Sequence, residues 1–70
     1  MGGRPVISVN GESMKWHPGM TVREILDAKR YTFPMIAVWI NGTPVPRDRF
    51  DETEVPDGAN VQVVHMIGGG

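Results

Sequence analysis

Two Asn-Gly dipeptides constrain the fold of this chain more than any other feature, because each stands between two short segments with strand-like alternation. Asn-Gly is the strongest short-range signal for a two-residue hairpin turn, since both of its residues tolerate a positive φ. The dipeptides are Asn10-Gly11 and Asn41-Gly42. The strands that they predict cover residues 5–9, 13–17, 35–40 and 43–46. The sequence therefore predicts two β-hairpins.

Each predicted strand places its apolar residues mainly on one face. Side chains alternate along a strand, so Ile7 and Val9 share a face. In the strand over residues 35–40, isoleucine and valine line one face while Trp39 lies on the other. Segment 43–46 contains two prolines, which cannot donate to a ladder, so it can only be a short edge strand. We therefore expect Trp39 on the sheet surface away from the core.

A short helix is predicted between the two hairpins. Thr21 and Glu24 have the spacing of a capping box, in which each residue satisfies a free backbone N–H at the helix start. Apolar residues then recur at helical spacing over residues 22–29. Two turns of helix are not stable alone in water. This helix must therefore pack on a sheet.

The last apolar segment, residues 61–67, is the most continuous one and is predicted to be the central strand of the sheet. The connection before it, residues 47–55, is polar with Phe50 as its apolar anchor. Strands, one helix and a closing strand in this order predict an α+β fold, with the helix across one face of a mixed sheet.

Composition excludes several classes of protein. The chain has no Cys, which excludes disulfides, thiolate zinc sites, iron–sulfur clusters and a cysteine nucleophile. Its net charge is −1, whereas nucleic-acid binders are usually strongly basic. A core of this size supplies only about 3–5 kcal/mol, which leaves little for a deep substrate cavity. We therefore expect no nucleic-acid partner and no free-standing enzyme.

The sequence also lacks the marks of a membrane protein or a metalloenzyme. No apolar run approaches the ~18 residues of a membrane span, and the first residues lack a secretion signal, so we expect a cytoplasmic protein. The only histidines are His17 and His65. Neither has a spacing from carboxylates that suggests a metal site or a catalytic triad.

The order of these motifs resembles the β-grasp sulfur-carrier family, the ThiS/MoaD superfamily, and within it the ThiS proteins of thiamine biosynthesis most closely. The resemblance covers residues 7–70. It rests on Ile7-Ser8-Val9-Asn10-Gly11, Gly19-Met20-Thr21-Val22, Val38-Trp39-Ile40-Asn41-Gly42, Val45-Pro46-Arg47, Asp57-Gly58 and the ending from Val63 to Gly70. The sequence departs from the family where Ala59 follows Asp57-Gly58 and where Gly68 precedes the last two glycines. The resemblance implies a ubiquitin-like β-grasp domain over residues 1–67, with four to five strands, and a flexible glycine tail over residues 68–70.

The resemblance also implies a chemistry for the carboxyl terminus. In this family the terminal carboxylate, here that of Gly70, is converted to an acyl-adenylate and then to a thiocarboxylate, which carries sulfur for thiazole formation. The protein itself binds no cofactor, because its activating partner uses the ATP and Mg²⁺. Glycine lacks a Cβ, so Gly69 and Gly70 can enter a narrow active site.

Such a carrier is implied to meet three partner enzymes in turn: a ThiF-like adenylating enzyme of the ubiquitin-activating type, a sulfur-donor enzyme and a ThiG-like thiazole synthase. Trp and Met are favoured at protein interfaces. The residues that we expect to contact these partners are Trp39, Val64, Met66, Ile67 and Gly68. The acidic segment 48–57 could steer a basic partner, although a solvated loop explains it more simply.

The sequence also allows other roles for a chain of this family. A MoaD-like carrier would supply sulfur to molybdopterin or another thio-metabolite, and a ubiquitin-like modifier would link Gly70 to lysines of target proteins. A β-grasp interaction module with an inert tail is the remaining class. Conjugates of higher mass that disappear on deletion of Gly69 and Gly70 would indicate the modifier. Normal function after the same deletion would indicate the inert module.

Overall fold

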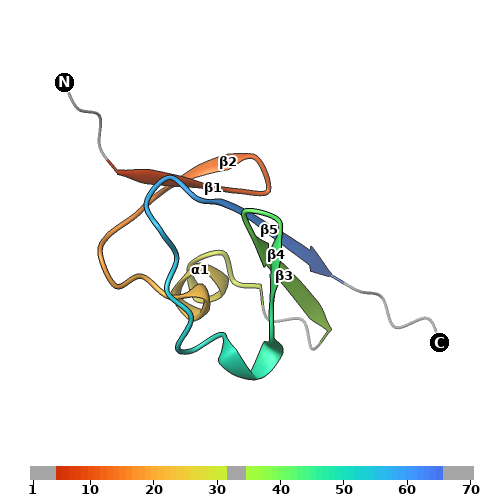
Figure 1. Ribbon diagram of the computed structural model, residues 1–70. Coiled ribbons are helices and arrows are strands. Elements are labelled where there is room, and N and C mark those ends of the chain that lie inside the picture. Colours follow the sequence, from red (N-terminus) through yellow and green to blue (C-terminus); the bar gives the residue numbers. More distant parts are fainter. Residues whose placement is uncertain (1–4, 32–34, 66–70) are drawn as a thin grey trace.

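The computed structural model describes residues 5–31 and 35–65 and contains a five-stranded sheet with one α-helix against it (Figure 1). The strands are β1 (Val6–Val9), β2 (Glu12–Lys15), β3 (Ile36–Ile40), β4 (Thr43–Val45) and β5 (Asn60–His65). The helix α1 spans Val22–Ala28, and a short 3₁₀ helix, η1, spans Arg47–Arg49. The predicted α+β fold is therefore confirmed.

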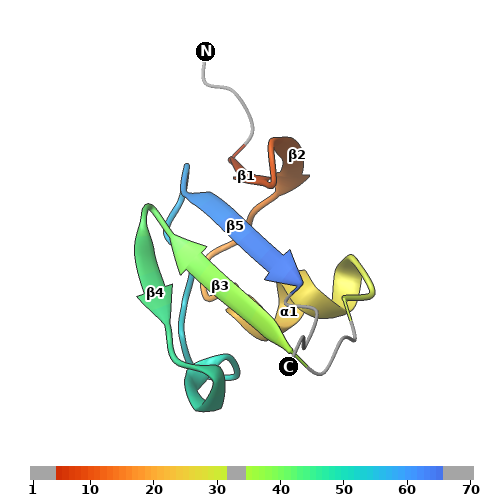
Figure 2. The same cartoon turned by 90° about the vertical axis from the view of Figure 1, so that its right-hand side faces the viewer.

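The sheet is mixed, with the strand order β2-β1-β5-β3-β4. Strands β1 and β5 pair in parallel, whereas the other neighbours pair antiparallel. Figure 2 shows β4, β3 and β5 side by side, with α1 behind them. The last strand is central and the proline-containing strand β4 lies at an edge, as predicted. Within the sheet, β5 thus lies between the first hairpin and the second.

Both Asn-Gly dipeptides form the predicted hairpin turns. Asn10 and Gly11 have φ of 52° and 85°, and Asn41 and Gly42 have φ of 51° and 83°. These positive values at both positions are those of a type I′ turn, which matches the twist of the flanking strands. The local sequence therefore determines both reversals of the chain.

Strand β2 begins and ends earlier than the predicted range 13–17. A two-residue turn makes the next residue pair at once, and Glu12 accordingly lies opposite Val9. The backbone N–H of Trp16 still donates to Pro5 O at 3.2 Å. The Trp16 indole turns away and donates from Nε1 to Val55 O at 2.6 Å, which ties the first hairpin to the loop before β5.

The capping box at the start of α1 is present as predicted. The Thr21 hydroxyl accepts from the backbone N–H of Glu24 at 3.4 Å, and the Glu24 carboxylate accepts from Thr21 N at 3.3 Å. The helix ends at Ala28, one residue before the predicted limit, and Lys29 is its C-cap. Arg30 follows with a φ of 58°, so the chain turns out of the helix there.

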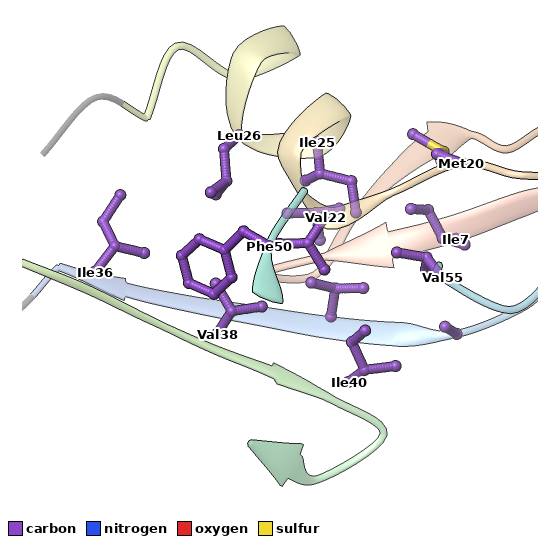
Figure 3. Packing of buried hydrophobic residues seen from close by; sticks show 13 residues of the cluster. Ile7, Met20, Val22, Ile25, Leu26, Ile36, Val38, Ile40, Phe50 and Val55 are labelled. Atoms are coloured by element: carbon purple, nitrogen blue, oxygen red, sulfur yellow. The ribbon is translucent and has the colours of Figure 1, made fainter. Parts of the chain in front are cut away.

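The core lies between α1 and the inner face of the sheet (Figure 3). Alternate residues of β1, β3 and β5 meet the apolar side of the helix. Phe50, from the connection after η1, lies between Leu26 of the helix and Val38 of β3 in Figure 3. The buried residues are Ile7, Val9, Met20, Val22, Ile25, Leu26, Ile36, Val38, Ile40, Phe50, Val55, Ala59 and Val61. The predicted core face is therefore confirmed.

Strand β5 differs from its prediction in two ways. It spans Asn60–His65 and so begins one residue before the predicted range 61–67, whose residues 66 and 67 lie outside the described part of the chain. It is also buried on one face only: Val61 is fully buried, whereas Gln62 and Val64 are exposed. Central placement in this sheet comes from pairing on both edges, because none of the described helices and strands forms a second layer over the outer face.

The predicted glycine tail, residues 68–70, also lies outside the described residues. Across the segments 5–31 and 35–65, no helix is long and apolar enough to cross a membrane.

Candidate docking face and the strand that leads to Gly70

The sheet register brings Trp39 and Val64 to the same outer face. Trp39 lies opposite Gln62, and Ala37 lies opposite Val64, so Trp39 and Val64 are diagonal neighbours across β3 and β5. The Trp39 side chain is partly exposed and Val64 is 46% exposed. Two of the residues predicted to contact partners are therefore together on one surface, which we call the docking face.

The remainder of the outer face is polar toward β2. Ser8 of β1 lies opposite Ser13 of β2, and Lys15 lies opposite Val6. Among the strand residues that the structure describes on this face, Lys15 carries the only charge. Val6 of β1 is a further exposed apolar residue on this face. The diagonal pair of Trp39 and Val64 lies on β3 and on β5, the strand from which the chain continues to Gly70. Small exposed apolar patches rimmed by polar residues are typical of protein interfaces.

Two asparagine side chains hold β5 from its two sides. The Asn10 amide binds both backbone groups of Val63: Oδ1 accepts from Val63 N at 2.8 Å, and Nδ2 donates to Val63 O at 3.1 Å. The Asn41 Oδ1 accepts from Asn60 N at 2.9 Å. Sequence reasoning found these asparagines only as turn residues. Nothing in the sequence indicates a bond that joins residues 53 positions apart.

His17 has a carboxylate partner that its sequence spacing did not suggest. Its Nε2 lies 2.7 Å from Glu24 Oε1, and its Nδ1 lies 2.9 Å from Pro18 O. The hydrogen bond to Glu24 raises the pKa of His17, and the same bond lowers the pKa of Glu24. Both groups are exposed, and in the described part of the chain no three His, Asp or Glu side chains gather as a metal site.

The acidic segment 48–57 is partly paired with cations of the same chain. Arg23 Nε lies 2.8 Å from Asp51 Oδ1, and Arg49 lies 3.3 Å from Glu52 Oε2. These pairs are exposed and tie the loop to α1 and η1. The pairing leaves less negative charge for a basic partner and agrees with the simpler interpretation of a solvated loop.

A shallow groove of about 380 Å³ lies at the other end of the sheet. It runs between β4 and residues 53–56, and Pro44, Pro46 and Pro56 form much of its wall. Its lining is mainly apolar and includes the carboxylate of Glu54 but no histidine. The groove adjoins the Asn41-Gly42 turn, whereas Val64 lies toward the other end of β5.

The other predicted site residues cannot be placed in this way. Met66, Ile67, Gly68, Gly69 and Gly70 lie outside the described residues. Their position in the chain nevertheless follows directly from His65, the last residue of β5. The described part of the candidate site therefore consists of Trp39 and Val64 on the docking face and of β5 as far as His65.

Comparisons with known proteins agree on one family. The profile of the ThiS family matches residues 7–70. The sulfur carrier protein ThiS of Bacillus subtilis (strain 168) is 26% identical over 66 residues, which are 93% of this chain and 100% of that protein. The uncharacterized protein ycf40 of Porphyra purpurea is 28% identical over 64 residues, which are 91% of this chain and 90% of that protein.

The solved structures give the same result for the fold. A crystal structure of the thiamine biosynthesis protein (ThiS) from Geobacter metallireducens matches with a TM-score of 0.74 and 31% sequence identity. The match covers 93% of this chain and 99% of that chain. The β-grasp fold and the family resemblance read from the sequence are therefore confirmed.

Proposed function

Because the chain belongs to the ThiS family of sulfur carriers, we propose that it supplies sulfur for thiazole formation in thiamine biosynthesis through a thiocarboxylate on Gly70. The observation that carries this proposal is the family match, which runs along the chain as far as Gly70. As a sulfur carrier, the protein acts as a co-substrate of partner enzymes.

The chemistry starts from a carboxylate that is ionised at neutral pH and is a poor electrophile. In the activating enzyme, a carboxylate oxygen of Gly70 attacks the α-phosphorus of ATP and pyrophosphate leaves. Sulfide supplied by the donor enzyme then attacks the acyl carbon, AMP leaves, the S–H proton is lost to solvent, and the product is the thiocarboxylate. The ATP and its Mg²⁺ belong to the ThiF-like activating partner. A ThiG-like thiazole synthase then takes the sulfur.

The docking face gives these partners a common surface. Trp39 and Val64 supply the apolar contact, on the strand pair whose central member leads to the reactive end. Met66, Ile67 and Gly68 continue the chain from β5 toward Gly70 and are proposed to contact the partner active site. An aromatic anchor on a small face is typical of residues that dominate binding energy.

Tandem mass spectrometry of the C-terminal peptide tests the proposal. The full chain is incubated with a ThiF-like activating enzyme, ATP, Mg²⁺ and a sulfide source, and we expect sulfur at Gly70. Fragment ions are required because replacing oxygen by sulfur changes nominal mass as methionine oxidation does, and the chain has five Met. Fragments that retain Met66 but not Gly70 separate the two changes.

A variant lacking Gly69 and Gly70 is the matched control and should gain no sulfur under the same conditions. An unchanged Gly70 carboxylate, with an enzyme that is active on a control carrier, would contradict the proposal. Addition of thiazole synthase together with its acceptor substrates should transfer the sulfur to them and return the thiocarboxylate to a carboxylate. If molybdopterin synthase, and not thiazole synthase, consumes the thiocarboxylate, the carrier chemistry stands and the proposed thiamine pathway is wrong.

A further inference from the structure

The Asn10 side chain extends the parallel ladder between β1 and β5 past the end of β1. The ladder begins with the bonds from Ser8 N to Ala59 O and from Asn10 N to Val61 O. The backbone of β1 then turns away at Asn10-Gly11, so it has no further strand residue to pair with Val63. The Asn10 amide replaces that missing strand, because it binds both Val63 N and Val63 O.

In the described part of the chain, this amide clamp follows the last backbone pairing between β1 and β5. The register of the two strands ends at Val9 opposite Val61. Beyond Val63, the described strand pairing of β5 is with β3, through Val64 opposite Ala37 and His65 opposite Ile36. Val63 is therefore the point at which the strand passes from two neighbours to one, seven positions before Gly70.

The second hairpin provides a natural comparison. Asn41 has the same dipeptide, the same turn and nearly the same φ as Asn10, and its side chain also binds β5. It binds at Asn60, however, where β5 begins. Its Oδ1 accepts from Asn60 N, a role that a carboxylate oxygen can also fill, whereas Asn10 both accepts and donates.

We propose that Asn10 is a positioning residue for the reaction at Gly70, because its amide fixes Val63 and thereby the end of β5 that presents the reactive terminus to partner enzymes. This inference rests on the carrier function proposed above. Without the amide, Val63 loses its β1-side partners and has to be ordered when the protein docks. Ordering one residue's backbone corresponds to roughly one order of magnitude in an equilibrium constant.

Substitution by glycine isolates the amide. Asn10→Gly keeps the positive φ that the turn requires and removes only the side chain. Asn41→Gly is the matched control, since it makes the same change in the same turn at the other end of β5. Asn10→Asp and Asn41→Asp form a second pair: the carboxylate of the first opposes Val63 O, whereas that of the second retains its acceptor role.

Amide hydrogen exchange tests the clamp without any partner enzyme. We expect Asn10→Gly to speed exchange at Val63 about tenfold, the loss that one or two net hydrogen bonds produce. Asn10→Asp keeps an oxygen acceptor for Val63 N and loses only the donor to Val63 O, so it should speed exchange less. The amides of Ile25 and Leu26 in α1 should exchange as in the wild type, which would show that the domain stays folded. Unchanged exchange at Val63 in both Asn10 variants would overturn the clamp.

Steady-state kinetics of adenylation test the positioning role. With the ThiF-like enzyme and ATP, we expect Asn10→Gly to raise KM for the carrier about tenfold while kcat stays within about twofold, because only docking has to order Val63. Asn41→Gly and Asn41→Asp should leave both constants within about twofold of the wild type. Equal effects of the Asn10 and Asn41 variants would overturn the positioning role.

The two experiments separate this inference from the proposed function. A wild-type chain that is never adenylated would end the carrier proposal, while the exchange result at Val63 would still decide whether the clamp exists. Faster exchange at Val63 with normal KM and kcat would show a clamp that serves the fold alone, and the positioning role would be wrong.

Discussion

The two faces of the sheet are formed by the same strands, yet they differ in how far their side chains are exposed. On the inner face, alternate residues such as Val38 and Val61 are fully buried against α1. On the outer face of the same strands, Trp39 and Val64 remain accessible. Because side chains alternate with a period of two, one strand can serve the core and an interface without compromise between them.

The comparison also explains why the register matters so much in this domain. A slip of one residue would exchange the two faces of a strand. In β3 it would expose isoleucine and valine and bury Trp39 against the helix. The two type I′ turns prevent such a slip, since a two-residue loop sets which residues pair. The turns therefore protect the docking face as well as the core.

The largest difference between the faces should appear in stability. Leu26 of α1 is 2% exposed, and Leu26→Ala should lower the free energy of unfolding by about 2–5 kcal/mol, the cost of removing buried methyl groups and leaving a cavity. Val64→Ala on the outer face should change it by only about 0.5 kcal/mol. Urea unfolding followed by circular dichroism measures both. Similar losses for the two variants would break the comparison.

The second-largest effect should appear in partner binding, where a substitution on the outer face should matter more than one in the core. Trp39→Ala should raise KM for the carrier in adenylation by about 30-fold or more, as expected for an aromatic anchor whose loss costs about 2 kcal/mol. Its stability should fall by less than that of Leu26→Ala. Lys15→Ala, on the same face but on β2, is the control and should bind nearly normally. A normal KM for Trp39→Ala would show that the activating enzyme binds another surface of the domain.

A smaller effect is expected where the helix that covers the inner face begins. Thr21→Ala removes the hydroxyl that caps α1 and should lower the free energy of unfolding by about 1 kcal/mol. Thr21→Ser keeps the hydroxyl and should stay close to the wild type. Thermal unfolding of the three proteins gives the comparison. If the alanine and serine variants unfold together, the capping bond contributes nothing to holding the helix over the core.

The smallest effect concerns the exposed pair beside that helix start. The bond to Glu24 raises the pKa of His17 from 6.5, so its stabilisation is present below pH 6.5 and is lost as pH rises through the folded-state value. The bond lowers the pKa of Glu24 from 4.5, so its stabilisation is present above pH 4.5 and is lost on acidification through the folded-state value.

The pair should therefore contribute most between about pH 4.5 and 6.5. We expect Tm of the wild type to fall slightly more than that of His17→Gln between pH 5.5 and pH 8.5, and differential scanning calorimetry at both pH values measures this. Identical pH profiles for the two proteins would show that the pair is fully screened by solvent.

Local sequence was sufficient for the turns, the helix start and the face of each strand. Asn10-Gly11, Asn41-Gly42 and the Thr21–Glu24 capping box each act through atoms only a few residues apart, so their chemistry can be read without the fold. Trp39 was placed on the outer face for the same reason. The predicted limits of α1, of the strands β1 to β4 and of the start of β5 were wrong by one or two residues, because pairing or capping decides where an element ends.

Tertiary structure alone decided what holds β5. Its parallel pairing with β1, the bond from the Trp16 indole to Val55 O and the clamp of Asn10 on Val63 all join residues far apart in the chain. Such bonds exist only after the loop between their partners has closed, and no local propensity encodes that closure. The sequence by itself thus determined the pieces and their apolar faces, whereas the folded sheet determined which residues secure the strand that leads to Gly70.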